Sequence, residues 1–143
     1  LFRSLTKTYR NLEHYGNPEK ILSDVEKQIH RRILLQTKTL ILTPRYLVEL
    51  SDDICAIIPL PEVLWIYDHA AMRRTIKGRQ LSYTIHVVTM KGEEYTLTGK
   101  SHREVSAIYH ELNTRYPNFF FGYSKEHQEM VQYVLHEMKN EKA

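Results

Sequence analysis

The chain has a single cysteine, Cys55, among its 143 residues. One cysteine cannot form a disulfide within the chain, which excludes the class of small disulfide-stapled domains. Its neighbours Ile54 and Ala56 are apolar, and this setting is typical of a small buried hydrophobic residue, not of a reactive thiol. The chain is long enough for one domain with a hydrophobic core of its own.

Long hydrophobic runs are also missing. A helix needs about 20 consecutive apolar residues to cross a bilayer, whereas the apolar stretches here have the length of strands, and the start of the chain shows no signal-peptide pattern. Because the chain begins with Leu1 and not with methionine, we expect it to be part of a longer protein. We predict a cytoplasmic location, and tethering through a segment preceding Leu1 stays open.

The patterns that usually carry catalysis or cofactor binding are absent. The five glycines form no phosphate-binding loop, and the eight histidines form no H-x-x-x-H pair. Ser101 and His102 are consecutive at a predicted helix start, so their side chains do not face each other. Glu93 and Glu94 are consecutive near a predicted strand, where neighbours point to opposite faces. We therefore predict no enzymatic activity, no cofactor and no metal site.

Helix signals are present near both ends of the chain. Asn17 and Pro18 have the residue types of an N-cap and a first helical position. Ser101 and Glu104 have the spacing of a capping box, and Ser124 precedes another amphipathic run. Between these helices lie β-branched and aromatic segments with alternating polarity. Runs of strands flanked by helices predict an α+β domain.

The strand half of the sequence carries a resemblance. The segments "ILTPRYLVEL", "IIPLPEVLWIYDH" and "YTIHVVTMKGEEYTLTG", followed by a capped helix ending in "RYPN", resemble uncharacterised bacterial PH-like domains over residues 33–138. The resemblance implies a PH-like curved antiparallel sheet packed by C-terminal helices, with a helical N-terminal extension. We accordingly expect the extension at residues 1–32 and the PH-like α+β domain at 33–143.

Basic residues gather in one short segment without an acidic residue, namely Arg73, Arg74, Lys77 and Arg79. A basic loop of this kind could bind an anionic group or surface. A solvated connection between strands is the alternative, because charged runs often serve solubility. No aromatic residue interleaves with these cations, and single-stranded nucleic-acid sites usually combine the two. We therefore predict these four residues as ligand-binding and expect no nucleic-acid partner.

Two functions fit these observations. The first is a non-enzymatic protein-interaction or scaffold domain, which would bind a protein or peptide partner at a sheet edge or in the groove between sheet and helix. The alternative is a peripheral membrane module that binds anionic lipid through the basic loop.

Three consecutive phenylalanines, Phe119 to Phe121, separate the last two predicted helices. In an extended segment the first and third point to one side and the second to the other. We expect at least two of them to be buried, where they would fix the last helix against the sheet. The alternative is an exposed apolar segment that contacts a membrane or a partner, since a large exposed apolar patch often marks an interface.

Overall fold

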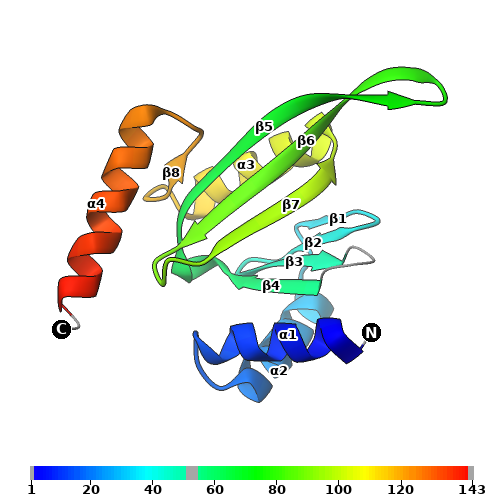
Figure 1. Ribbon diagram of the computed structural model, residues 1–143. Helices are drawn as coiled ribbons and strands as arrows, with labels where there is room; N and C mark the ends of the chain where they lie inside the picture. Colours follow the sequence, from blue (N-terminus) through cyan, green and yellow to red (C-terminus); the bar gives the residue numbers. More distant parts are fainter. Residues whose placement is uncertain (1, 51–54, 142–143) are drawn as a thin grey trace. The chain divides into compact units, whose positions relative to one another are not determined.

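The protein is described by a computed structural model that covers the backbone of residues 2–50 and 55–141 and the side chains of residues 8–50 and 56–141. The side chain of Cys55, which we predicted to be buried, lies outside the described residues. The chain divides into two compact units, residues 1–62 and 63–143, whose elements are labelled in Figure 1. The predicted domain boundary after residue 32 stays a prediction.

The first unit contains two helices followed by a four-stranded antiparallel sheet in the order β1-β2-β3-β4. Its elements are α1 (Phe2–Glu13), α2 (Pro18–Arg31), β1 (Leu35–Gln36), β2 (Leu40–Leu42), β3 (Tyr46–Leu50), β4 (Cys55–Pro59) and the short 3-10 helix η1 (Leu60–Glu62).

One face of this sheet packs against both helices. Ile41, Val48 and Ile57 lie opposite one another on adjacent strands, and they form one buried cluster with Leu12 of α1 and Val25 of α2. Each helix thus contributes the residues of its apolar face to this core. The first unit therefore has a hydrophobic core of its own.

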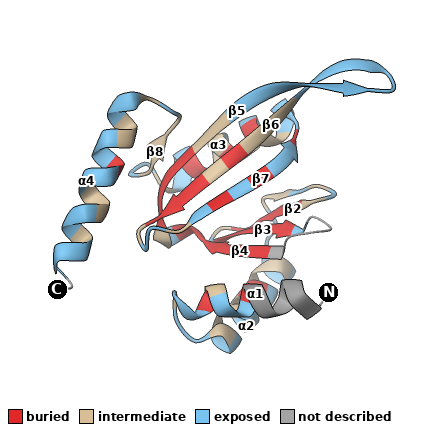
Figure 2. Cartoon of the chain, in the orientation of Figure 1, coloured by how far each residue is buried: buried red, intermediate tan, exposed pale blue. Residues whose placement is uncertain are grey.

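The second unit is a sheet in the order β7-β6-β5-β8 with two helices. Its elements are β5 (Val63–Thr75), β6 (Gly78–Thr89), β7 (Glu94–Lys100), α3 (His102–Arg115), β8 (Phe120–Phe121) and α4 (Lys125–Glu141). Strand β8 runs parallel to β5, whereas the other neighbours are antiparallel. Figure 2 shows that burial in β5 and β6 is confined to the half that lies beside β7 and β8.

The two helices of this unit cover opposite faces of its sheet. Val131 of α4 belongs to a buried cluster with Trp65 and Val88, which are paired across β5 and β6. On the other face, the Tyr109 hydroxyl of α3 donates a hydrogen bond to the Asp68 carboxylate of β5. Residues 65 and 68 differ by an odd number, so they point to opposite sides of the strand.

The three phenylalanines connect these layers. Phe120 packs in the cluster under α4, whereas Phe121 contacts Tyr109 of α3, with ring centroids 6.1 Å apart, and Phe119 lies against Phe121. The predicted alternation is therefore confirmed. The predicted burial is wrong, because all three side chains are only half-buried. The reason is that β8 is the edge strand, and an edge is covered from one side only.

The α+β class predicted from the sequence is confirmed, and so are the helix starts. The Asn17 side chain accepts hydrogen bonds from the backbone at the start of α2, and Ser101 and Glu104 form the complete capping box of α3. The strands form two separate sheets, and the PH-like comparison stays a prediction.

Candidate functional site

The predicted basic segment is a β-hairpin arm, not a loop. The β5–β6 ladder continues through Arg74 opposite Arg79 to Thr75 opposite Gly78, so only Ile76 and Lys77 form the turn. Neither β7 nor β8 extends along this hairpin. The pairing of β6 with β7 ends at Tyr83, and the pairing of β5 with β8 ends at Ile66. We call residues 70–81 the arm. The extension of β5 and β6 into the arm was not predicted from the sequence. Alternation of apolar and polar residues indicates a strand with one buried face, and both faces of the arm are exposed.

Every residue of the arm is exposed, as the pale blue ends of β5 and β6 show in Figure 2. Three of them are large and apolar: Ile76 in the turn is fully exposed, and Met72 and Leu81 are 62% and 54% exposed. Met72 and Leu81 lie opposite each other and so share one face of the arm. Several exposed large apolar side chains on one short arm are unusual, and exposed apolar surface often marks an interaction site.

Turn chemistry does not explain the isoleucine at the tip. Within the described chain no residue other than glycine has a positive φ, and Gly78, with φ of 118°, supplies it here. Ile76 and Lys77 therefore occupy turn positions that polar residues fill easily. The Thr75 hydroxyl donates a hydrogen bond to the Gly78 carbonyl and closes the turn without help from the Ile76 side chain.

The structure places all four predicted cations, Arg73, Arg74, Lys77 and Arg79, toward the tip of the arm. Arg74 and Arg79 lie directly opposite each other, and like charges in this position destabilise a sheet. Residues 70–81 contain no acidic residue. Among the described residues none of these four arm cations forms an ion pair. The arm is therefore a concentrated, uncompensated positive charge next to exposed apolar side chains.

A stack of aromatic and histidine rings lies on the sheet face at the root of the arm. His69 Nδ1 and His86 Nε2 are 2.9 Å apart and share a hydrogen bond. Tyr67 stacks on His86 with ring centroids 4.7 Å apart, and Trp65 follows at 4.2 Å from Tyr67. Burial lowers the pKa of His86, and the neighbouring charge of His69 lowers this pKa further.

The histidine pair was not predicted from the sequence, because its members are 17 positions apart. The signal that could have found it is the hairpin register. In that register Tyr67 lies opposite His86, and residues two apart on a strand share a face, so His69 comes next to His86. The sequence predicted only a loop between these two strands, and a loop does not define this pairing.

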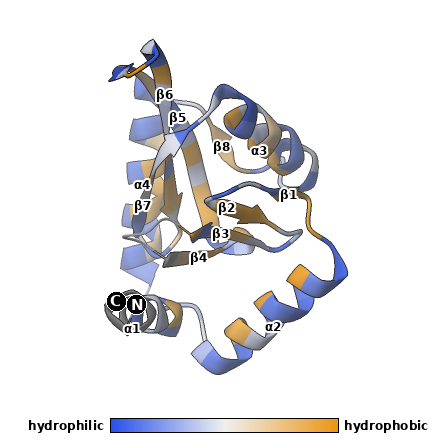
Figure 3. Cartoon of the chain, turned by 90° about the vertical axis from the view of Figure 1, so that its right-hand side faces the viewer, coloured by the Kyte–Doolittle hydropathy of each residue, from blue (hydrophilic) through white to orange (hydrophobic). Residues whose placement is uncertain are grey.

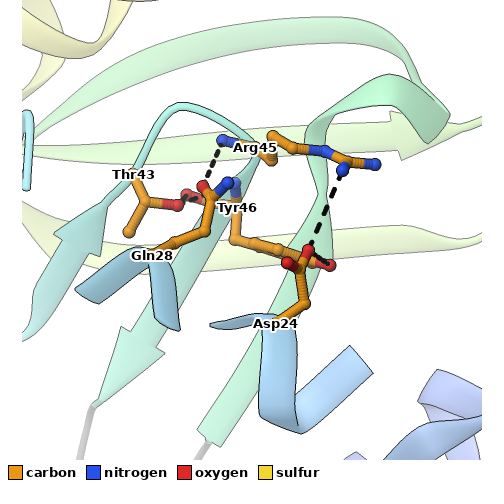
Figure 4. A network of polar contacts seen from close by, with 5 residues as sticks. All are labelled: Asp24, Gln28, Thr43, Arg45 and Tyr46. Carbon is orange, nitrogen blue, oxygen red and sulfur yellow. Dashed lines mark hydrogen bonds and ion pairs between the residues drawn. The ribbon is translucent and has the colours of Figure 1, made fainter. Parts of the chain in front are cut away.

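A polar network in the first unit ties α2 to the turn between β2 and β3 (Figure 4). The Tyr46 hydroxyl donates to Asp24 at 2.7 Å, and the backbone N–H of Arg45 donates to Gln28 Oε1 at 3.0 Å. The Thr43 hydroxyl oxygen accepts from the Tyr46 backbone at 3.0 Å. Burial and then the hydrogen bond to Asp24 raise the pKa of the Tyr46 hydroxyl, which therefore stays protonated as a donor.

Two of the pockets in the described part of the first unit lie near this network. The smaller, of about 170 Å³, lies beside Tyr15, Tyr46 and Pro59. The larger, of about 220 Å³, lies beside α2 next to the polar network and is called the α2 pocket. Its lining residues are Asp24, Lys27, Gln28, Arg31, Arg32 and Pro44.

In the described ranges no three histidine, cysteine, aspartate or glutamate side chains gather as a metal site would need. No helix among the described residues combines the length and the apolar character needed to cross a membrane.

Comparison with known proteins places the chain in a family but gives no activity. No curated protein and no solved structure matches the chain. The model of one family matches residues 15–131, a span that includes parts of both units and the whole arm. The chain therefore belongs to this family, the domain of unknown function DUF6709.

Proposed function

We propose that the protein is a non-enzymatic docking module whose arm binds an anionic membrane surface. The observation that carries this proposal is the fully exposed Ile76 at the tip of the arm, between cations that have no ion-pair partner in the described chain. An apolar tip enters the boundary between headgroups and acyl chains, and the cations behind it meet the lipid phosphates.

The expected binding free energy supports membrane binding by the arm. Each Lys or Arg close to an anionic leaflet contributes about 1 kcal/mol, so the four arm cations together contribute roughly 4 kcal/mol. Burying the Ile76 side chain adds about 2 kcal/mol. The sum of about 6 kcal/mol corresponds to roughly a 10⁴-fold preference for the surface. Arm binding alone would therefore hold the protein reversibly.

The shape of the arm also fits. Strands rise about 3.3 Å per residue, so the arm extends roughly 20 Å from Ala70 to its tip. Ile76 and the four cations lie toward its far end, whereas Met72 and Leu81 lie nearer the root, on the face that also carries Arg74 and Arg79. The tip can reach a surface while α3 and α4 keep their contacts with the sheet.

Co-sedimentation with vesicles tests the proposal. We expect wild-type protein to bind vesicles of phosphatidylcholine with phosphatidylglycerol, to bind pure phosphatidylcholine weakly, and to be released by salt. Replacing the four arm cations by glutamine should abolish binding. Ile76→Ser should weaken it by about 30-fold while preserving the salt dependence.

A matched variant controls for net charge. Lys91, Arg103, Lys125 and Lys139 are exposed cations of the same unit outside the arm, and their joint replacement by glutamine removes the same charge. This variant should retain most of the binding. Equal loss in both quadruple variants would mean that only overall charge matters, and the proposed role of the arm would then be wrong.

A protein or peptide partner is the second candidate. The outer edges of the arm have no strand neighbour within the described chain, and an extended peptide can add to such an edge through main-chain hydrogen bonds. This mode uses the backbone, so it would tolerate glutamine at the four arm cations. An Arg79→Pro variant, which removes one backbone donor from β6, should impair peptide binding more than vesicle binding.

A further inference from the structure

The α2 pocket is a second basic feature, and it lies in the other unit. Figure 4 shows the polar network beside it, and Figure 3 shows that α2 is largely hydrophilic. The pocket has a volume of about 220 Å³ and is lined by three cations, Lys27, Arg31 and Arg32. Lys27 and Arg31 are four positions apart on α2 and therefore lie on the same side of the helix.

Asp24 is the only acidic side chain among the described lining residues, and it is already engaged. Its carboxylate accepts a hydrogen bond from the Tyr46 hydroxyl at 2.7 Å and lies 3.9 Å from the Arg45 guanidinium. None of the three pocket cations has an ion pair among the residues that the structure describes. The pocket therefore presents three positive charges that the carboxylate in it does not neutralise.

The Gln28 side chain adds a neutral donor. Its carbonyl oxygen accepts from the Arg45 backbone at 3.0 Å, which fixes the orientation of the amide. The NH₂ group of the same amide can then donate to a ligand, since Gln carries two donors beside its acceptor. The lining thus combines charged and neutral donors, the pattern that recognises an oxyanion.

The helix dipole of α2 explains the presence of only some of the three pocket cations. The C-terminal end of a helix carries partial negative charge and favours cations in its last turn, which accounts for Arg31 and for Arg32 beside it. Lys27 precedes that turn, and the effect falls off within one turn. The same helix end disfavours an anion, so a ligand must gain enough from several cations to offset it. A doubly charged group satisfies this condition better than a carboxylate.

We propose that the α2 pocket binds a phosphate monoester group, held by Lys27, Arg31 and Arg32 with the Gln28 amide as a further donor. The group could belong to a soluble phosphorylated molecule or to a lipid headgroup, because the recognised chemistry is the same. The proposal is independent of the function proposed for the arm, which lies in the other unit.

Titration with inorganic phosphate tests the pocket. Amide shifts of the full chain are followed by NMR at constant ionic strength, with chloride replaced by phosphate. We expect saturable shifts for residues 24–32 and for Arg45, with a Kd on the order of 1 mM. Replacing Lys27, Arg31 and Arg32 together by glutamine should weaken binding by about tenfold or more.

A charge-matched control removes three exposed cations of the same unit, Arg10, Lys20 and Lys38, and should change the Kd by less than about twofold. Circular dichroism establishes that both triple variants are folded. Shifts that do not saturate by roughly ten times the expected Kd, or equal losses in the two variants, would overturn the proposal.

Vesicles that contain phosphatidic acid, a phosphate monoester lipid, then identify the source of the group. If the pocket variant loses affinity for them but not for phosphatidylglycerol, a phosphodiester, the ligand is a lipid headgroup. If both vesicle types bind the variant as well as wild type while phosphate binding is lost, the ligand is soluble. Either result supports the pocket, and the intact arm in these variants keeps the test separate from the arm's own role.

Discussion

The hydrogen bond between Tyr109 and Asp68 connects α3 to β5 and should be measurable by removing one oxygen. In Tyr109→Phe the ring keeps its edge contact with Phe121, at 6.1 Å between centroids, and only the hydroxyl is lost. Hydrogen bonds to charged groups contribute about 1.5–3 kcal/mol. Because both partners are only half-buried, water can partly replace the hydroxyl, so we expect a loss of about 1.5 kcal/mol.

Urea unfolding followed by fluorescence measures this loss. The chain has one tryptophan, Trp65, which is buried in β5 of the same unit. We expect a lower midpoint with an unchanged m-value, since the folded state keeps its compactness. For a chain of this size the melting temperature should fall by roughly 5 °C.

A double-mutant cycle isolates the pair. Combining Tyr109→Phe with Asp68→Asn should cost less than the sum of the single changes by about 1 kcal/mol. Tyr133→Phe, at a tyrosine that is 66% exposed on α4, serves as the control and should be neutral. If Tyr109→Phe were as neutral as this control, or if the cycle showed no coupling, the hydrogen bond would not stabilise the unit.

Two further predictions concern the same unit. Because the pKa of His86 is below 6.5 in the folded protein, the unfolded chain binds more protons at mildly acidic pH. Stability should therefore fall as the pH decreases from about 6.5 to the lowered pKa. Urea midpoints across this range should show a weaker dependence for His86→Gln, and an unchanged dependence would contradict the assignment. Gly122 has φ of 80°, and no heavy atom lies within 4 Å of the place that a Cβ would take, so Gly122→Ala should cost about 1–2 kcal/mol through backbone strain alone. Gly122→Asn should cost less, since asparagine tolerates this conformation; equal thermal stability of all three proteins would refute it.

Local signals were readable from the sequence, whereas pairings between distant residues were not. Asn17 and Ser101 act on backbone groups two or three positions away, so their spacing alone predicts the helix starts. Gly92 likewise has a positive φ in the turn between β6 and β7, a backbone conformation that glycine adopts at no steric cost. The contact between His69 and His86 depends on a register that extends over many residues, which no short pattern encodes.

The basic segment is a second case in which the sequence identified the residues but not their structure. Its composition identified Arg73, Arg74, Lys77 and Arg79 as a group, but an apolar–polar alternation reports a strand only where one face is buried. The arm is exposed on both faces, so its strands carry no such pattern. The three phenylalanines had the opposite difficulty, because their alternation was clear but the extent of their burial depends on β8 being an edge strand.

The parallel pairing of β8 with β5 determines when the second unit can complete its fold. The Trp65 indole N–H donates to the Gly122 carbonyl at 2.9 Å, across 57 positions of sequence, and the Gly122 N–H donates back to Ile66. On the ribosome, β5 is synthesised long before its β8 neighbour. The β5–β6–β7 meander can form from local contacts, but the loop that ends in β8 closes late because its closure carries a larger entropy cost. Until then the Trp65 indole lacks its native acceptor, the Gly122 carbonyl. Nearly the whole unit must therefore be synthesised before β8 can pair with the edge of the sheet at β5.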